Sequence, residues 1–167
     1  VAPDFAGMGT TGPNSYLIGD TAAHTLLDAI RAARQIPATQ ASSRVVMWGH
    51  SQGGQAVLFA AQDASTYAPE LKIVAVAAAA PVTNLNAFMK AHQDDISGVT
   101  IGSDAFLACQ AGDGPTPPGL RLNGTLSDPA IRNSMTMNQL CLLPQLSRLH
   151  TIGQPLVGRF LTHAPAV

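Results

Sequence analysis

The chain has 167 residues, of which 46% are apolar and only 11% charged, and its formal net charge is −1 with no basic cluster. This length fits one domain with a sizeable buried core. The weak charge offers nothing to a nucleic acid and suits a neutral or apolar partner better. No apolar run is long enough to cross a bilayer, so we expect no transmembrane segment, and we interpret the first residues as lacking a signal-peptide pattern.

The N-terminal stretch predicts a strand end followed by a glycine-rich loop. Residues 1–3 are interpreted as the tail of a strand, and because the first residue is Val1 and not Met, we interpret the chain as processed or truncated. Residues 6–14 contain three glycines and Pro13. Such a loop either passes over an active site or ligand or is an ordinary exposed connection.

A helix is predicted over residues 20–33. Asp20 is a plausible N-cap, apolar residues recur at helical spacing, and Pro37 stops the pattern. His24 and Asp28 lie four residues apart on this helix, and we interpret them as surface polar residues and not as ligands.

The main chemical motif is G-x-S-x-G at residues 49–53, between a short β-rich apolar run and an alanine-rich, helix-like segment. This order predicts a nucleophile elbow with Ser51 as nucleophile, whereas the alternative is a glycine-rich turn with an incidental serine. The turn is sharp, so we expect positions 49 and 53 to need residues without a Cβ, which explains why both are glycine. The backbone N–H of Gln52 and the positive end of the helix dipole would hold an oxyanion.

Residues 71–80 are almost entirely apolar and predict a parallel strand buried on both faces. Together with the preceding elements this gives strand, helix, strand, helix, strand, the α/β pattern. Beyond Pro81 the alternation stops. We therefore predict an α-rich insertion over residues 84–150, with helices near 83–93 and 128–146, and leave residues 151–167 unassigned.

A serine hydroxyl needs a base to accept its proton. His50 is discounted because a strand-end neighbour points away from the apex. In one interpretation, residues 105–112 form a strand that ends at Asp113, and this acid completes a compact triad with His150 or His163. In the other, the same residues belong to the α-rich insertion. No metal site is predicted.

Two cysteines, Cys109 and Cys141, could pair with each other, pair with cysteines outside the chain, or stay as free buried thiols.

Several segments carry a family resemblance. These are A-P-D-F-A-G-M-G (residues 2–9), D-A-I-R-A (28–32), G-H-S-Q-G-G (49–54), S-T-Y-A-P-E-L-K-I-V (65–74) and, more weakly, Q-L-C-L-L-P-Q (139–145). On these residues the chain resembles the secretory lipase family of α/β-hydrolases, most closely its actinobacterial members. The match covers most of residues 1–93 and is patchy beyond.

The resemblance implies a partial or minimal α/β-hydrolase fold, with a core over residues 1–83 and a cap or lid over 84–150. It implies hydrolysis of carboxylic esters, commonly lipids, through an acyl-enzyme on Ser51, with Gln52 as an oxyanion donor, no cofactor, and secretion from the cell. It also suggests that Cys141 has a disulfide partner upstream of Val1. In the family the second oxyanion group lies upstream of this chain, and the acid and histidine follow the cap, so we expect truncation at both ends.

Three function classes follow. The first is a serine carboxylic-ester hydrolase (lipase or esterase), which contact with a lipid interface would suit. The second is a catalytically deficient hydrolase-fold fragment or binding module. The third is another acyl-transfer enzyme, such as a peptidase or acyltransferase. Missing flanking strands would leave open sheet edges and apolar faces, so we also expect self-association.

Overall fold

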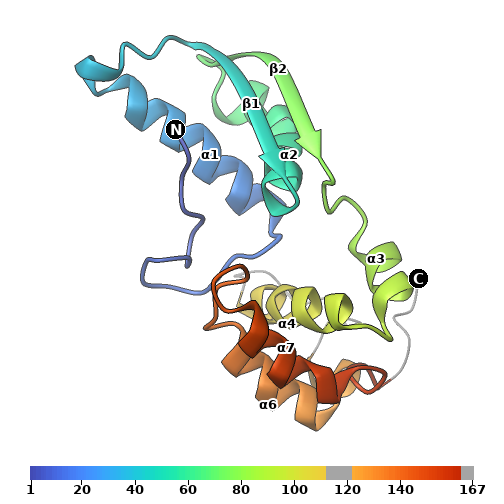
Figure 1. Ribbon diagram of the computed structural model, residues 1–167. Helices are drawn as coiled ribbons and strands as arrows, with labels where there is room; N and C mark the ends of the chain where they lie inside the picture. The colour runs from blue at the N-terminus through green and yellow to red at the C-terminus, as the bar shows by residue number, and fades with distance from the viewer. Residues whose placement is uncertain (112–121, 163–167) are drawn as a thin grey trace. The chain divides into compact units, whose positions relative to one another are not determined.

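Two parallel strands, β1 (Arg44–His50) and β2 (Lys72–Ala79), form the sheet of the first of two units, Val1–Thr83 (Figure 1). This computed structural model describes residues 1–111 and 122–162. Residues of β1 alternate between exposed and buried, as in a strand with one covered face. The register shifts between Val45, which pairs with Ile73, and Val46, which pairs with Ala75.

Helices α1 (Gly19–Arg34) and α2 (Gln52–Tyr67) complete this unit, with a short 3-10 turn, η1 (Pro37–Thr39), after α1. Ala56, Ala60 and Ala64 of α2 are buried, and such small side chains let a helix lie close to a sheet. The core joins both helices to the covered face of β1; it includes Ala23, Leu27, Val45, Met47, Val57 and Leu71. The predicted α/β class is confirmed.

Three local predictions for this unit are wrong. Residues 1–3 form no strand. Ile18, not Asp20, is the N-cap of α1, and Asp20 lies in the first helical turn, where its charge complements the helix dipole. Strand β2 is not buried on both faces, and Val74 is 41% exposed. An apolar run shows only that both faces of a strand could be covered, and not that other elements cover them. In this unit, only one face of the two-stranded sheet is packed against helices.

The second unit, Asn84–Val167, is mainly helical in its described residues, with turns and irregular segments between the helices. Its elements are α3 (Leu85–His92), α4 (Ile96–Ala111), α5 (Leu122–Thr125), α6 (Asp128–Met137), α7 (Leu146–Gly153) and the 3-10 turn η3 (Gln154–Leu156). Helix α4 packs against α3, α6 and α7 around a core that includes Met89, Val99, Phe106, Met137 and Phe160. The predicted α-rich character is confirmed; the division at residue 150 stays a prediction.

The interpretation of residues 105–112 as a strand is wrong, because this stretch continues helix α4 to Ala111. Alanine, leucine and glutamine are good helix formers, and α4 is buried on several sides, so its sequence lacks the one-sided apolar spacing of a surface helix. Cys109 and Cys141 are not bonded to each other, and burial raises the pKa of Cys109. The pairing of Cys141 with a cysteine outside the chain stays a prediction. Within residues 1–111 and 122–162, no helix has the length and apolarity needed to cross a membrane.

Candidate active site

Ser51 lies at the junction of β1 and α2 in an unusual backbone conformation, with φ 54° and ψ −116°. A serine rarely adopts a positive φ, and such a residue costs on the order of 1–3 kcal/mol unless its surroundings hold it. The holding contact is a hydrogen bond of 2.9 Å from the Ser51 N–H to the carbonyl oxygen of Ala79 at the end of β2. The serine is therefore fixed by both strands of the sheet.

The glycines around Ser51 have different roles. A Cβ on Gly49 would lie 2.0 Å from the carbonyl oxygen of Gly53, which no side chain allows. A Cβ on Gly54 would lie 3.1 Å from the carbonyl oxygen of Ala79, which is tight. A Cβ on Gly53 would meet nothing within 4 Å, so the prediction for Gly53 is wrong. The backbone of Gly53 is what leaves no room for a side chain at Gly49. The second glycine that lies close to other backbone atoms is Gly54, beside Ala79.

The Ser51 hydroxyl does not cap the helix that it precedes. A serine at the N-cap usually accepts a hydrogen bond from the first turn, as Ser127 does from the Ala130 N–H before α6. Ser51 occupies the same position before α2 but makes no side-chain capping bond. Its positive φ redirects the side chain, and the partly buried hydroxyl stays available for chemistry.

The N-terminus of α2 supplies partial positive charge beside Ser51. The first N–H groups of a helix, here beginning at Gln52, have no partner within the helix, and the dipole of a long helix amounts to roughly +0.5 charge at this end. Helix α2 has 16 residues and no acidic residue in its first turn to neutralise that charge. The location suits an anion that develops near the Ser51 oxygen.

The glycine-rich loop contacts this elbow. Its base is closed by Ser15, whose N–H and hydroxyl both donate to the carbonyl oxygen of Ala6, at 3.1 and 2.9 Å. Gly7 has φ 77°, and a Cβ there would lie 2.0 Å from the Pro13 carbonyl oxygen. The side-chain amide of Gln52 reaches the Met8 sulfur at 3.8 Å. The loop is thus a folded neighbour of the elbow.

The predicted partners of Ser51 do not belong to the described part of its own unit. His150 is exposed on α7 in the second unit, while Asp113 and His163 lie outside the described residues. His50 ends β1 on its exposed side. Within the first unit, residues 1–83, no imidazole is hydrogen-bonded to the Ser51 hydroxyl.

Two other histidines are paired with aspartates. His24 Nε2 lies 2.7 Å from Asp63 Oδ2, and His92 Nδ1 lies 2.6 Å from Asp95 Oδ2. Asp95 also accepts the N–H groups of Ser97 and Gly98 at the start of α4, and its pKa is lowered by the bond from His92 and by these N–H groups. Each pair lies within its own unit: His24–Asp63 joins α1 to α2 in the first, and His92–Asp95 joins the end of α3 to the turn before α4 in the second.

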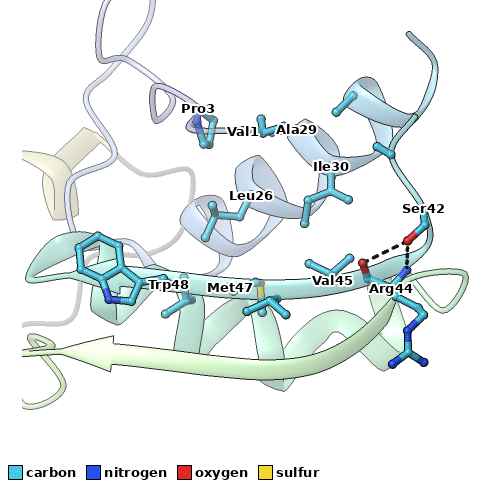
Figure 2. Close-up of a pocket in the computed structure, with 14 residues that line it drawn as sticks. Val1, Pro3, Leu26, Ala29, Ile30, Ser42, Arg44, Val45, Met47 and Trp48 are labelled. Carbon is cyan, nitrogen blue, oxygen red and sulfur yellow. Dashed lines mark hydrogen bonds between the residues drawn. The ribbon is translucent and has the colours of Figure 1, made fainter. Parts of the chain in front are cut away.

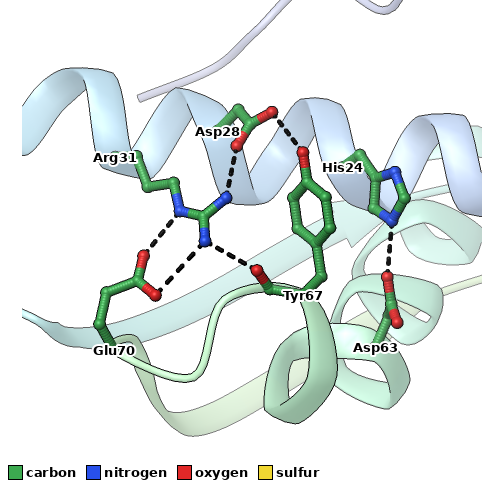
Figure 3. Close-up of polar contacts among 6 residues, drawn as sticks. All are labelled: His24, Asp28, Arg31, Asp63, Tyr67 and Glu70. Atoms are coloured by element: carbon green, nitrogen blue, oxygen red, sulfur yellow. Dashed lines mark hydrogen bonds and ion pairs between the residues drawn. The ribbon is translucent and has the colours of Figure 1, made fainter.

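A network of polar side chains fastens α1 to the end of α2 (Figure 3). Arg31 donates to both carboxylate oxygens of Glu70, to Asp28 and to the Tyr67 carbonyl, and the Tyr67 hydroxyl donates to Asp28 at 2.7 Å. Tyr67 lowers the pKa of Asp28, and Arg31 lowers that of Glu70. His24 stacks on the Tyr67 ring at 3.7 Å. The interpretation of His24 and Asp28 as surface residues missed this cross-brace.

A hollow of about 280 Å³ lies along β1, and Ser51 is not among the residues that line it (Figure 2). Val45, Met47 and Trp48 of β1 line it together with Leu26 and Ile30 of α1. Within the described chain, β1 pairs only with β2, so its other edge is unpaired. On the uncovered face, Val46 is 69% and Trp48 71% exposed.

No group of three or more histidine, cysteine or acidic side chains gathers into a metal-binding cluster within residues 1–111 and 122–162.

Comparisons with known proteins show which family the chain is similar to. Residues 1–108 match the family model described as secretory lipase. Lipase 5 of Candida albicans is 35% identical over 96 residues, which cover 54% of this chain and 20% of that protein. Lipase 9 of the same organism is 33% identical over 101 residues, 58% of this chain and 21% of its own length. The chain thus spans about a fifth of these relatives.

Among solved structures, the closed state of Candida antarctica lipase A is similar to this chain, with a TM-score of 0.57 and 19% sequence identity. The similarity covers 75% of this chain and 28% of that one. At this identity the likeness concerns the fold, and it confirms the predicted partial α/β-hydrolase architecture.

Proposed function

Because the chain belongs to the secretory lipase family, we propose that it is a serine carboxylic-ester hydrolase that forms an acyl-enzyme on Ser51. The observation that supports this most directly is the N-cap serine that leaves its helix uncapped and holds a positive φ. This arrangement costs stability and frees the hydroxyl, as a nucleophile requires. The names of the relatives point to lipid esters as substrates, and the family to a secreted protein.

In the proposed reaction, the Ser51 oxygen attacks the carbonyl carbon of the ester and its proton passes to a base. The C=O electron pair moves to the oxygen, where the Gln52 N–H and the α2 dipole stabilise the negative charge. The C–O bond to the alcohol then breaks, the alcohol takes the proton, and water hydrolyses the acyl group to release the acid. Residues 84–150 are the proposed cap. Because residues 105–111 are helical, the strand on which the compact triad of Asp113 and His150 depended is absent, and His150 stays the candidate base within this chain that the experiment below tests.

A second candidate is a hydrolase-fold fragment or binding module without catalytic turnover. It is favoured by the lack, within residues 1–83, of an imidazole on the Ser51 hydroxyl, and by the pairing of His24 with Asp63 in the same unit. A serine without its base keeps only a residual rate from the oxyanion site and substrate binding.

The test is covalent labelling of Ser51 by a fluorophosphonate, combined with the burst of p-nitrophenol from an activated ester at stoichiometric protein. We expect labelling and a burst that Ser51→Ala abolishes. Ser127→Ala is the matched control, because Ser127 is also an N-cap serine but its hydroxyl caps the helix. This variant should retain both signals. Absence of both signals in the unsubstituted protein would refute the enzyme proposal and leave the binding module.

The base and the substrate class need separate measurements. His150→Ala should remove the burst while Ser51 remains in place, and an unchanged burst would exclude His150 as the base. Faster hydrolysis of tributyrin than of a peptide ester or peptide amide would support a lipase or esterase. The reverse preference would favour a peptidase on the same elbow.

A further inference from the structure

Two glutamines on the first turn of α2 reach the segment that precedes α1. Gln52 and Gln55 are three residues apart and therefore lie on the same side of the helix. Gln52 touches Met8 in the glycine-rich loop, and the Gln55 side-chain N–H donates to the carbonyl oxygen of Leu17 at 3.0 Å. The helix that begins at Ser51 thus holds both the loop and the turn behind it.

The turn behind the loop is closely fitted to α2. Leu17 has φ 58°, a left-handed conformation that a leucine does not adopt without support. Two residues later, a Cβ on Gly19 would lie 2.3 Å from the ring of Phe59, one helical turn beyond Gln55. The backbone of this turn therefore lies directly against the side chains of α2.

Gln55 is buried in an unusual way. It is 5% exposed, and its Oε1 has no hydrogen-bond partner among the described residues, although its amide nitrogen is bonded to Leu17. Leaving a buried acceptor unpaired opposes folding, and an apolar side chain of similar size would avoid this. The bond to Leu17 is the one polar interaction that the side chain makes there among described residues.

We propose that Gln55 is a positioning residue of the candidate active site. Its amide holds the Leu17 turn, and through it the glycine-rich loop, against the helical turn that carries Ser51. The loop position then sets how bulky a group can reach the serine. This inference rests on the proposed function for its meaning, but the hydrogen bond can be tested without catalysis.

Hydrogen exchange tests the bond directly. In Gln55→Met two amides should exchange about three- to tenfold faster, as expected for one lost hydrogen bond: that of Ser15, which closes the base of the loop, and that of Ile18, which donates to Ser15 in the turn behind it. Gln62→Met, at an exposed position of the same helix, is the matched control and should leave them unchanged. Equal exchange in the two variants overturns the proposal.

Gln55→Glu separates the hydrogen bond from simple packing. A protonated carboxyl can donate to the Leu17 carbonyl, whereas an ionised one repels it, and burial raises the pKa of such a group. Loop exchange, taken relative to Gln62→Met at each pH, should therefore match the unsubstituted protein at acidic pH and accelerate as pH rises. A pH-independent ratio would assign Gln55 to packing and overturn the proposal. This arm also decides the matter if Gln55→Met unfolds.

Labelling of Ser51 tests the link to the site. The ratio of rates for a bulky and a small fluorophosphonate should change at least threefold in Gln55→Met and stay constant in Gln62→Met. A constant ratio despite faster loop exchange overturns the positioning role. If the unsubstituted protein is not labelled at all, the proposed function fails, while the exchange experiments still test the Gln55 bond.

Discussion

The two glycines nearest Ser51 in the motif should respond in opposite ways to alanine. In Gly49→Ala the new methyl group would lie 2.0 Å from the Gly53 carbonyl oxygen and 2.7 Å from the Gly54 nitrogen, both backbone atoms of the elbow. Overpacking costs typically about 1–3 kcal/mol, and a clash with rigid backbone belongs at the upper end, about 3 kcal/mol. In Gly53→Ala the methyl group meets nothing within 4 Å. Alanine in a helix is better than glycine by about 0.5–1 kcal/mol.

The two variants should therefore differ by about 4 kcal/mol in free energy of unfolding. With an m-value of about 2 kcal/mol/M, their urea midpoints would be about 2 M apart, with the unsubstituted protein between them. Fluorophosphonate labelling of Ser51 should be lost in Gly49→Ala, because the turn must shift, and kept in Gly53→Ala. Equal midpoints, or destabilisation by Gly53→Ala, would refute the account of the elbow given by its close contacts.

Three further predictions concern charge and association. Burial raises the pKa of Asp104 to about 7. The folded state therefore binds this proton more tightly than the unfolded state does. Its contribution to stability is lost as pH rises from about 4 to about 7. Asp104→Asn should stabilise the protein by up to about 4 kcal/mol at pH 8 and not at pH 3, and urea midpoints that shift equally at both pH values would contradict this. The pKa values of Asp28 and Glu70 are lowered, so their contribution to stability is present above about pH 4 and lost as pH falls further. Arg31→Met should reduce this acid sensitivity in thermal melts, chiefly by removing the Glu70 part, while the Tyr67 bond retains part of the Asp28 effect. An unchanged profile would show that Arg31 contributes nothing to it. Finally, we propose that the open face and edge of β1 drive self-association, so Trp48→Lys should give a smaller species by light scattering, and identical masses would exclude this face.

The local parts of the site could be predicted from sequence because they depend on neighbouring residues. The G-x-S-x-G motif places Ser51 between a strand and a helix, and both are present as β1 and α2. The error at Gly53 arose because the motif shows which residues are small, and not which backbone atoms approach each other. Only the fold shows that Gly54, outside the motif, lies against Ala79 and Pro81.

Long-range contacts could not be read from spacing. Gln55 and Leu17 are 38 residues apart, and Arg31 and Glu70 are 39 apart. Neither partner carries a local pattern that marks it. A signal did exist for the second pair, since residues 28–32 and 65–74 were both among the segments that carry the family resemblance, and the structure brings them into one network.

Burial was also misjudged where it depends on distant neighbours. The apolar run of β2 predicted two covered faces, but coverage is a property of what packs against a strand and not of the strand itself. Helix α4 gave the opposite error. Its burial on several sides removed the one-sided spacing by which a helix is recognised, so part of it resembled a strand.

The hydrogen bond from the Ser51 N–H to Ala79 has a consequence for how the chain folds. The elbow cannot take its strained shape from residues 49–54 alone, because the acceptor that holds it lies 28 positions later, at the end of the second strand. During synthesis the serine must therefore wait until β2 has emerged and paired with β1. We expect the reactive geometry to form late, after the folding transition state. Substitutions at the elbow should then change the unfolding rate and leave the folding rate nearly unchanged.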